Sequence, residues 1–284
     1  MPIYMDRHDI SETVTAENVA KLHQQDLKIQ HKFNCRALTY WFDEGRKTAF
    51  CLIEAPQKQA IEAMHKKAHG QVPHRIIEVD STIVESFLGR IEDPQRSRNT
   101  VLNIINDPAF RTIMVIRSEI ISLIKYNSAQ INLSLQKFRK IITKILNHYN
   151  GNIVKLYEDY FLVSFKSVSK AVLCALAIQS KVKVLNNKND NNIIFKIGLS
   201  AGAPVTEKGY LFEDTIKLAE RMSDNKKDVI VVSSEVKELY KSENNNNFFD
   251  EKLVLPLMPA DEKFLIHFMD YIERTWQNAQ TDFK

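Results

Sequence analysis

Along the first 80 residues, the spacing of the apolar positions changes several times between the period of a strand and the period of a helix. The predicted strands cover residues 3–8, 35–42, 47–55 and 74–79, and the predicted helices run from an N-cap at Thr15 to Gln30 and from Pro56 to Gly70. Residues 43–46 supply the turn of a central hairpin. The order β-α-β-β-α-β is the ferredoxin-like motif, so we expect an α+β fold for residues 1–80.

A second domain is predicted from residue 111 onwards. Residues 81–110 form a connector, with a short helix over 84–91 and a polar boundary stretch over 92–98. The predicted strands that follow cover 111–116, 152–156, 160–165, 193–200, 229–232 and 264–272, and the predicted helices cover 128–149, 168–184, 212–222 and 234–239. We therefore expect a second α+β domain over residues 111–284. Both domains are expected to place their helices against one face of an antiparallel sheet.

Composition narrows the class of protein. The 284 residues carry a formal net charge of +4. They hold no block of Lys and Arg with interleaved aromatic residues, so we expect no nucleic-acid partner. No stretch is apolar enough to span a membrane, and residues 1–10 lack the apolar core of a secretion signal, so a cytoplasmic protein is expected. Three cysteines do not make a disulfide framework.

Histidine is the unevenly distributed residue, because six of the eight histidines precede residue 75. On the first strand, the period of two puts Asp6 and His8 on the same face. His65 and His69 are four residues apart on the second helix, so they share one helix face and can chelate one divalent ion. Spacing alone leaves open the alternative that this histidine pair lies on a solvated helix edge.

The first helix carries a further imidazole–carboxylate pair. His23 and Asp26 are three residues apart and lie on the same side of that helix. A single histidine on a buried stripe is ordinarily a hydrogen-bonded core residue, so His23 has both a structural and a metal-binding interpretation.

Five short runs within residues 1–80 carry a family resemblance. They are Tyr4-Met5-Asp6-Arg7-His8, Ala20…His23…Asp26-Leu27, Tyr40-Trp41-Phe42-Asp43, Phe50-Cys51-Leu52-Ile53-Glu54-Ala55-Pro56 and His65…Ala68-His69-Gly70. Together they resemble a small bacterial ferredoxin-like family described as nickel-binding. The resemblance implies a homodimer and a bound divalent metal, nickel or another transition metal. The ligands expected from it are His8, His65, His69 and Asp6, with His23 and Cys51 as further candidates.

Four runs in the second domain carry another resemblance. They are the hairpin from Asn152 to Phe161, the run Ala171 to Gln179, the run Ile197 to Pro204, and Leu218-Ala219-Glu220-Arg221. Over residues 111–240 the chain resembles class III adenylate/guanylate cyclases. Three functional positions of that family keep their chemistry here: Asp159 matches a metal-binding aspartate, Lys155 the adenine-selecting lysine, and Arg221 the family's arginine.

Other functional positions of the cyclase family are altered. The second metal-binding aspartate matches Arg117, whose positive charge repels a metal ion, and the transition-state asparagine matches Lys217. The partner of the adenine-selecting lysine matches Tyr210, and the glycines beside the hairpin aspartate match Glu158 and Tyr160. Bulky side chains there crowd the phosphates, since glycine permits close approach. Glu119, two residues beyond Arg117, is an alternative carboxylate. We expect a domain that has lost the cyclase reaction, since several such losses make turnover improbable.

Three functions follow from the sequence. In the first, a metal-binding domain dimerises, and a degenerate cyclase domain relays a signal or binds a nucleotide or protein partner. In the second, the chain is an active cyclase with an N-terminal metal sensor; Arg117 and Lys217 argue against it. In the third, the N-terminal domain is a small-molecule enzyme with a cavity lined by Tyr4, Tyr40 and Cys51, together with Trp41.

Overall fold

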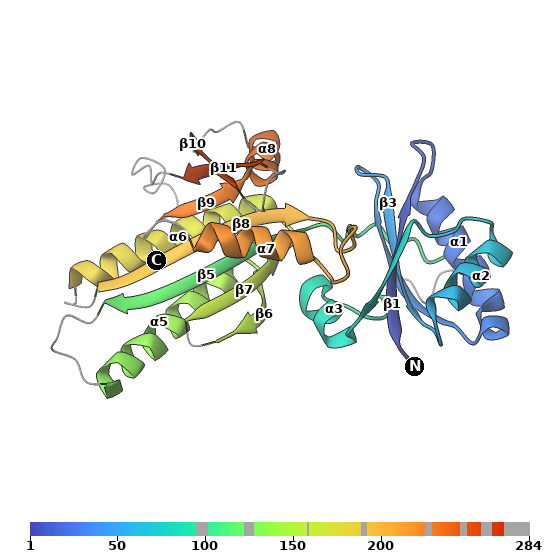
Figure 1. The fold of residues 1–284 in the computed structure, drawn as a ribbon, viewed down its shortest axis with the longest axis horizontal. Coiled ribbons are helices and arrows are strands. Elements are labelled where there is room, and N and C mark those ends of the chain that lie inside the picture. Colours follow the sequence, from blue (N-terminus) through green and yellow to red (C-terminus); the bar gives the residue numbers. More distant parts are fainter. Residues whose placement is uncertain are drawn as a thin grey trace. The chain divides into compact units, whose positions relative to one another are not determined.

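The computed structural model describes residues 1–94, 102–121, 128–157, 159–188, 192–224, 229–244, 249–256 and 263–269. The chain divides into two compact units. Unit 1 consists of residues 1–110 and 203–214, and unit 2 consists of residues 111–202 and 215–284. Each unit contains its own sheet (Figure 1). The division of the chain into functional domains at residues 80 and 110 stays a prediction.

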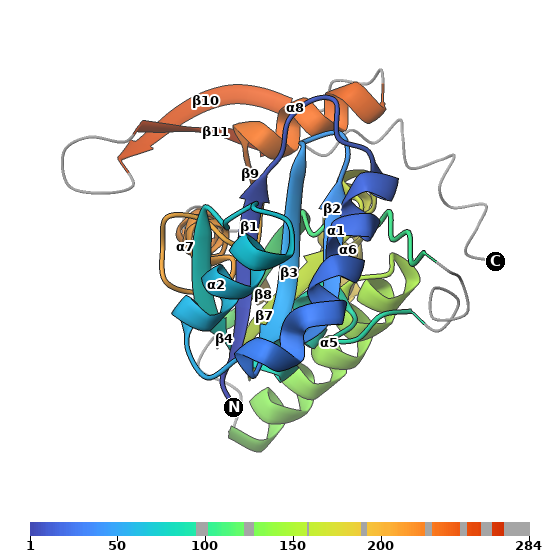
Figure 2. The same cartoon turned by 90° about the vertical axis from the view of Figure 1, so that its right-hand side faces the viewer.

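Unit 1 has the predicted ferredoxin-like fold. Its elements are β1 (Ile3–Asp9), α1 (Ala16–Ile29), the short helix η1 (Gln30–Phe33), β2 (Arg36–Asp43), β3 (Thr48–Glu54), α2 (Lys58–Ala68), β4 (Arg75–Val79) and α3 (Ser81–Leu88). The sheet order is β2-β3-β1-β4, and all its neighbouring strands are antiparallel. The predicted α+β class is confirmed. Figure 2 shows α1 and α2 lying across this sheet.

Local signals in the sequence explain where the helices of unit 1 begin and end. Thr15 and Asn18 form a reciprocal capping box at the start of α1, as predicted for the N-cap. The second helix begins two residues after the predicted Pro56, because Gln57 is extended and serves as the N-cap. Asp80 caps α3 by accepting hydrogen bonds from two backbone amides, and Gly89 ends it in a left-handed conformation.

Both faces of the unit 1 sheet are buried. Tyr4, Cys51 and Tyr40 belong to the core that the sheet forms with α1 and α2. Met5 and Leu52, which alternate with the residues of that core, are also fully buried. Figure 1 shows α3 on the opposite side of the sheet from α1 and α2. The two helices of the predicted ferredoxin-like domain lie on one face, as expected, and α3 of the predicted connector covers the other, since strands with two apolar faces need a cover on each.

Residues 102–110 pack into unit 1. The hydroxyl of Tyr40 on β2 donates to the backbone oxygen of Asn103 at 2.5 Å and accepts from the backbone amide of Ile105 at 2.9 Å. Ile105 is buried in the same core. This part of the predicted connector is therefore an ordered piece of unit 1, whereas residues 95–98 of the predicted boundary lie outside the described residues.

Unit 2 is built on a mixed sheet of order β10-β11-β9-β8-β5-β7-β6, in which β8 and β9 are parallel. Its elements are β5 (Arg111–Ile121), α5 (Ser128–His148), β6 (Asn152–Leu156), β7 (Tyr160–Phe165), α6 (Val168–Lys188), β8 (Asn192–Gly202), α7 (Glu213–Ser223), β9 (Ile230–Ser233), α8 (Ser234–Glu243), β10 (Phe249–Pro256) and β11 (Lys263–Met269). The sequence pattern missed β10, and residues 270–272 of the predicted last strand lie outside the described residues.

The helices of unit 2 cover both faces of its sheet. Side chains of α5, α6 and α8 share one core with alternate residues of the strands, such as Ile197 and Leu199. The residue between them, Gly198, faces α7, where an added Cβ would lie 2.1 Å from the backbone oxygen of Ala219. Figure 1 shows α7 on the near side of this sheet. The one-face antiparallel arrangement expected from the sequence is therefore wrong for unit 2.

Among the described residues, no helix combines the length and the apolar character needed to cross a bilayer.

Candidate metal centre

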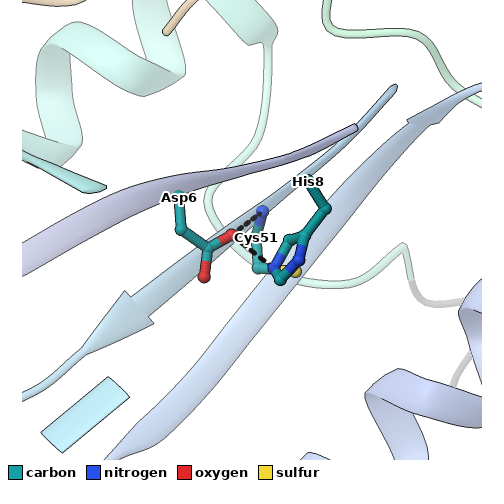
Figure 3. Close-up of side chains that lie close together, drawn as sticks. All are labelled: Asp6, His8 and Cys51. Atoms are coloured by element: carbon teal, nitrogen blue, oxygen red, sulfur yellow. Dashed lines mark hydrogen bonds and ion pairs between the residues drawn. The ribbon is translucent and has the colours of Figure 1, made fainter. Parts of the chain in front are cut away.

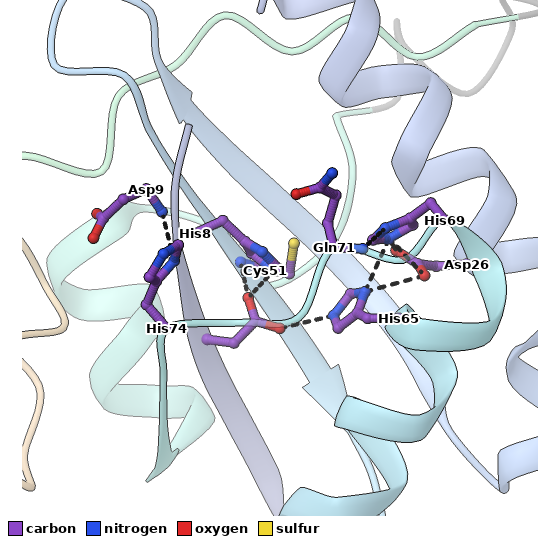
Figure 4. Close-up of polar contacts among 9 residues, drawn as sticks. His8, Asp9, Asp26, Cys51, His65, His69, Gln71 and His74 are labelled. Atoms are coloured by element: carbon purple, nitrogen blue, oxygen red, sulfur yellow. Dashed lines mark hydrogen bonds and ion pairs between the residues drawn. The ribbon is translucent and has the colours of Figure 1, made fainter. Parts of the chain in front are cut away.

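Four elements of unit 1 bring together six side chains with metal-binding chemistry. They form two groups, whose potential ligand atoms lie within 4.8 Å of one another inside each group: Asp6, His8 and Cys51, and Asp26, His65 and His69. Figure 3 shows the first group, which spans β1 and β3, and Figure 4 shows the wider set with α1 and α2. All six side chains are buried or partly buried.

The first group follows from strand register. Asp6 on β1 lies opposite Cys51 on β3, so both side chains point toward the helices. The backbone amide of Cys51 donates to Asp6 Oδ1 at 3.0 Å, and His8 Nε2 lies 3.4 Å from the same oxygen. Asp6 is 1% exposed. A carboxylate buried so completely needs these partners, since an uncompensated buried charge is costly.

The second group joins α1 to α2. His65 Nδ1 lies 3.1 Å from Asp26 Oδ1 and 3.2 Å from His69 Nε2. His69 Nε2 in turn lies 3.3 Å from Asp26 Oδ1. The helical spacing of four residues therefore does place both imidazoles beside one carboxylate. His65 is 1% exposed, so the alternative of a solvated histidine pair does not hold for it.

His65 connects the two groups. Its Nε2 donates to Asp6 Oδ2 at 2.9 Å, while its Nδ1 faces Asp26. The His8 and His65 rings meet edge to face, with centroids 5.1 Å apart. The six side chains therefore form one continuous buried network.

Protonation in this network follows from its hydrogen bonds. Burial acts to lower the pKa of His65, but its hydrogen bonds to Asp26 and Asp6 raise that pKa to about 10. Burial acts to raise the pKa of both aspartates, yet the neighbouring imidazoles hold each below its ordinary value. Burial and the nearby Asp6 raise the pKa of the Cys51 thiol well above its ordinary value. Without metal, His65 is therefore an imidazolium between two carboxylates.

The tautomer of His69 is also defined. The backbone amide of Gln71 donates to His69 Nδ1 at 3.1 Å, so Nδ1 carries no proton. In the neutral ring the proton is then on Nε2, which faces Asp26 and His65. A metal at His69 Nε2 would require this proton to move to Nδ1, because a histidine bound through one ring nitrogen ordinarily carries its proton on the other.

Five of the six residues expected as ligands lie together, and one does not. His23 lies outside both groups: its ring packs on Tyr40 with centroids 4.9 Å apart, and its Nε2 is 3.8 Å from Asp93 Oδ2. Asp26, which was not predicted as a ligand, is 2% exposed and belongs to the second group. A carboxylate on the buried face of an amphipathic helix was the available signal. The roles of all these residues as ligands stay predictions.

The donor set fits a divalent transition metal. Imidazole nitrogens suit nickel, copper and zinc, and a carboxylate or thiolate completes such sites. The imidazole and carboxylate donor atoms lie 2.9–3.4 Å from their nearest partners. Neighbouring ligands of an ion with bonds of about 2.1 Å are about 3 Å apart in an octahedral shell. An ion could therefore replace protons in this network with little movement of the side chains.

In unit 2, the retained cyclase-like residues are exposed. Asp159, Lys155 and Arg221 are all solvent-exposed. The backbone oxygen of Asp159 accepts from the amide of Ser118, which places the hairpin beside the residue that follows Arg117 on β5. Glu158 lies outside the described residues.

Arg117 is engaged in contacts of its own. Its Nε lies 3.0 Å from Asp224 Oδ1 and 3.1 Å from Ser223 Oγ, at the end of α7. Next to it, the Tyr160 hydroxyl donates to Glu220 Oε1 at 2.8 Å. At the position predicted to match a metal carboxylate of the cyclase family, the chain therefore has a cation paired with the end of a helix. Glu119 is exposed on the same strand.

Comparisons with known proteins give matches to both units. Residues 4–79 match the family described as "Nickel responsive protein SCO4226-like". The crystal structure of SCO4226 from Streptomyces coelicolor A3(2) is 30% identical, covers 27% of this chain and 94% of that chain, and has a TM-score of 0.26. The predicted resemblance of residues 1–80 to this family is confirmed, and metal binding by this chain stays a prediction.

Other matches are to cyclases. The "Putative adenylate cyclase 3" of Rhizobium meliloti (strain 1021) is 27% identical over 92 residues, which are 32% of this chain but 16% of that relative. The chain thus spans about a sixth of its length. An adenylate/guanylate cyclase/hydrolase from Silicibacter pomeroyi is 22% identical, covers 56% of this chain and 96% of that chain, and has a TM-score of 0.46. The resemblance to class III cyclases is confirmed; whether the reaction is retained is a separate question.

Proposed function

We propose that this protein binds a divalent transition metal, nickel foremost, through unit 1, and that unit 2 is a cyclase-like domain without cyclase activity. The protein then acts as a metal-responsive regulatory protein rather than an enzyme. The observation that carries the proposal is the buried network of three imidazoles, two carboxylates and one thiol. The family match over residues 4–79 favours nickel among the metals that such a donor set accepts.

The burial of the network supports a function beyond stability. Asp6 and His65 are each 1% exposed, and Asp26 is 2% exposed. Apolar side chains at such positions would often give equal or greater stability, because desolvation offsets most of the attraction within a buried ion pair. In the proposed metal-bound state, an ion takes the place of the proton on one ring nitrogen of His65. At Nε2 it would lie with Asp6, His8 and Cys51, and at Nδ1 with Asp26 and His69.

Calorimetry of protein purified without an affinity tag tests the metal site. Nickel should bind the wild type, and the triple variant His8→Ala, His65→Ala, His69→Ala should lose that binding. His31→Ala is the matched control, since His31 is an exposed histidine of the same unit on η1. Wild-type nickel affinity in the triple variant would refute the assignment, and circular dichroism of each variant verifies that it is folded.

The loss of cyclase activity is argued from charge. The reaction needs two divalent ions on the triphosphate, and the position of one metal carboxylate carries Arg117, which pairs with Asp224. Purified protein supplied with manganese and with ATP or GTP should form no cyclic nucleotide. Measurable turnover would overturn this part of the proposal and favour an active cyclase with a metal sensor.

Two further parts of the proposal concern partners. Asp159, Lys155 and Arg221 keep the side chains needed to contact a nucleotide, so unit 2 is proposed to bind a nucleotide or a protein partner without turnover. The resemblance of unit 1 leads us to propose a homodimer. Fluorescent nucleotide titration tests the first, and analytical ultracentrifugation with and without nickel tests the second.

A further inference from the structure

Helix α7 has residues in both units of the chain. The segment from Ala203 to Asp214 belongs to unit 1, although it connects β8 to α7 of the cyclase-like fold. The first two residues of α7, Glu213 and Asp214, are therefore part of unit 1, and the rest of the helix is part of unit 2. A helix is a stiff rod, so a shift at one end moves the other.

The segment is firmly held within unit 1. Val205 and Phe212 are fully buried, and the Phe212 ring packs on Phe87 of α3 with centroids 4.9 Å apart. The backbone amide of Phe212 donates to the oxygen of Pro204 at 2.8 Å, which closes the segment into a loop. Phe212 adopts a left-handed backbone conformation, with φ of 55°, that a bulky residue rarely accepts. The surrounding contacts must therefore fix this residue in place.

Strand β1, which carries Asp6 and His8, also contacts residues 203–214. Asp6 and His8 point toward the helices, and Arg7 between them points to the opposite face. Arg7 Nη1 lies 3.5 Å from the backbone oxygen of Val205. Arg75, the register partner of Arg7 on β4, donates from Nη2 to the backbone oxygen of Glu207 at 2.9 Å. A metal bound by Asp6 and His8 would hold in place the strand to which the segment is attached.

The other end of α7 lies at the altered catalytic positions. Ser223 and the adjacent Asp224 contact Arg117, and Glu220 accepts from Tyr160. Lys217, at the position of the transition-state asparagine, is on the same helix. We infer that residues 203–214 and α7 form a mechanical link, through which metal occupancy in unit 1 changes the contacts of Arg117 and Tyr160 in unit 2. This inference rests on the proposed metal-binding function and names the route of its regulation.

Hydrogen exchange measured by mass spectrometry on the full chain tests the link. Nickel added to metal-free protein should slow amide exchange in residues 3–9 and 58–69, which report the metal network. It should also slow exchange in residues 203–223 by about fivefold or more, the lower range of coupling between distant sites. In the variant Arg75→Ala, the effect on residues 203–223 should disappear, while the effect on residues 3–9 and 58–69 stays.

Arg36→Ala is the matched control, because Arg36 is an exposed arginine of the same sheet that pairs with Glu54 and Glu92. It should leave both effects unchanged. Slowed exchange confined to the metal network in the wild type overturns the link but leaves the proposed metal function standing. Retained coupling in Arg75→Ala, or equal loss in Arg36→Ala, overturns the route. An absence of any nickel effect, with no binding heat by calorimetry, removes the metal function and the link together.

Discussion

Replacing His65 by glutamine should flatten the pH dependence of unit 1 stability in the metal-free protein. His65 is held between Asp6 and Asp26, which raises its pKa to about 10 from a reference value of 6.5. Because the folded-state pKa lies above the unfolded one, the stabilisation is complete below pH 6.5 and is lost as the pH rises through 10. The aspartates have lowered pKa values, so they stay ionised throughout this range.

The size of the effect follows from linkage. With the two pKa values above, the contribution of His65 to the free energy of unfolding falls by about 3 kcal/mol between pH 6 and pH 9. His65→Gln has no titrating ring, so this part of the slope should vanish. At pH 6 the variant should also be less stable than the wild type by about 3–5 kcal/mol, because two buried carboxylates lose their cationic partner.

Hydrogen exchange in the presence of a chelator measures the opening free energy of α2 at each pH, after correction for the intrinsic exchange rate. His31→Gln serves as control, since His31 is exposed. If His65→Gln and the wild type showed the same change between pH 6 and pH 9, His65 would not be the imidazolium that the geometry requires. The reasoning about the metal-free network would then be wrong.

Three further changes have defined outcomes. Gly198→Ala should destabilise the packing of α7 on β8 by about 1–3 kcal/mol, measured by thermal denaturation, because the new Cβ would meet the oxygen of Ala219. The control Gly209→Ala, with open space around its Cβ, should have little effect in the same measurement. Thr15→Ala should cost about 1 kcal/mol by removing the capping box of α1, measured by urea denaturation against Thr13→Ala. Tyr160→Phe should cost about 1 kcal/mol by removing the hydrogen bond to Glu220, seen as faster amide exchange at the end of α7, and unchanged exchange there would contradict the contact.

The fold was largely predictable because local signals agreed with tertiary structure. Thr15 and the hairpin turn at residues 43–46 marked the boundaries of unit 1 elements correctly. The elements that cover the second face of the unit 1 sheet were not predictable in the same way. The alternating pattern shows that Met5 and Leu52 share a face, but it does not show what packs on that face. What packs on the far face includes α3, which follows the motif, and residues 203–214, which are more than 100 residues further along the chain.

The candidate site was predictable in part. Strand period and helix spacing placed Asp6 with His8 and His65 with His69, and the structure joins the two pairs. Helical spacing pairs Asp26 with His23 on α1, whereas in the structure its carboxylate contacts His65 of α2. The positions of Asp26 and of Cys51 depend on how α1 and β3 pack against their neighbours, and a single sequence carries no direct signal of that packing.

The path of the chain limits how this protein can be divided or recombined. The backbone passes from one unit to the other after Phe110, again after Gly202, and once more after Asp214. A gene fragment that ends at residue 110 would encode unit 1 without the piece that buries Phe87, and the complementary fragment would carry that piece without its binding surface. A division of the chain at residue 110 would therefore separate Phe87 from Phe212, the aromatic ring on which it packs.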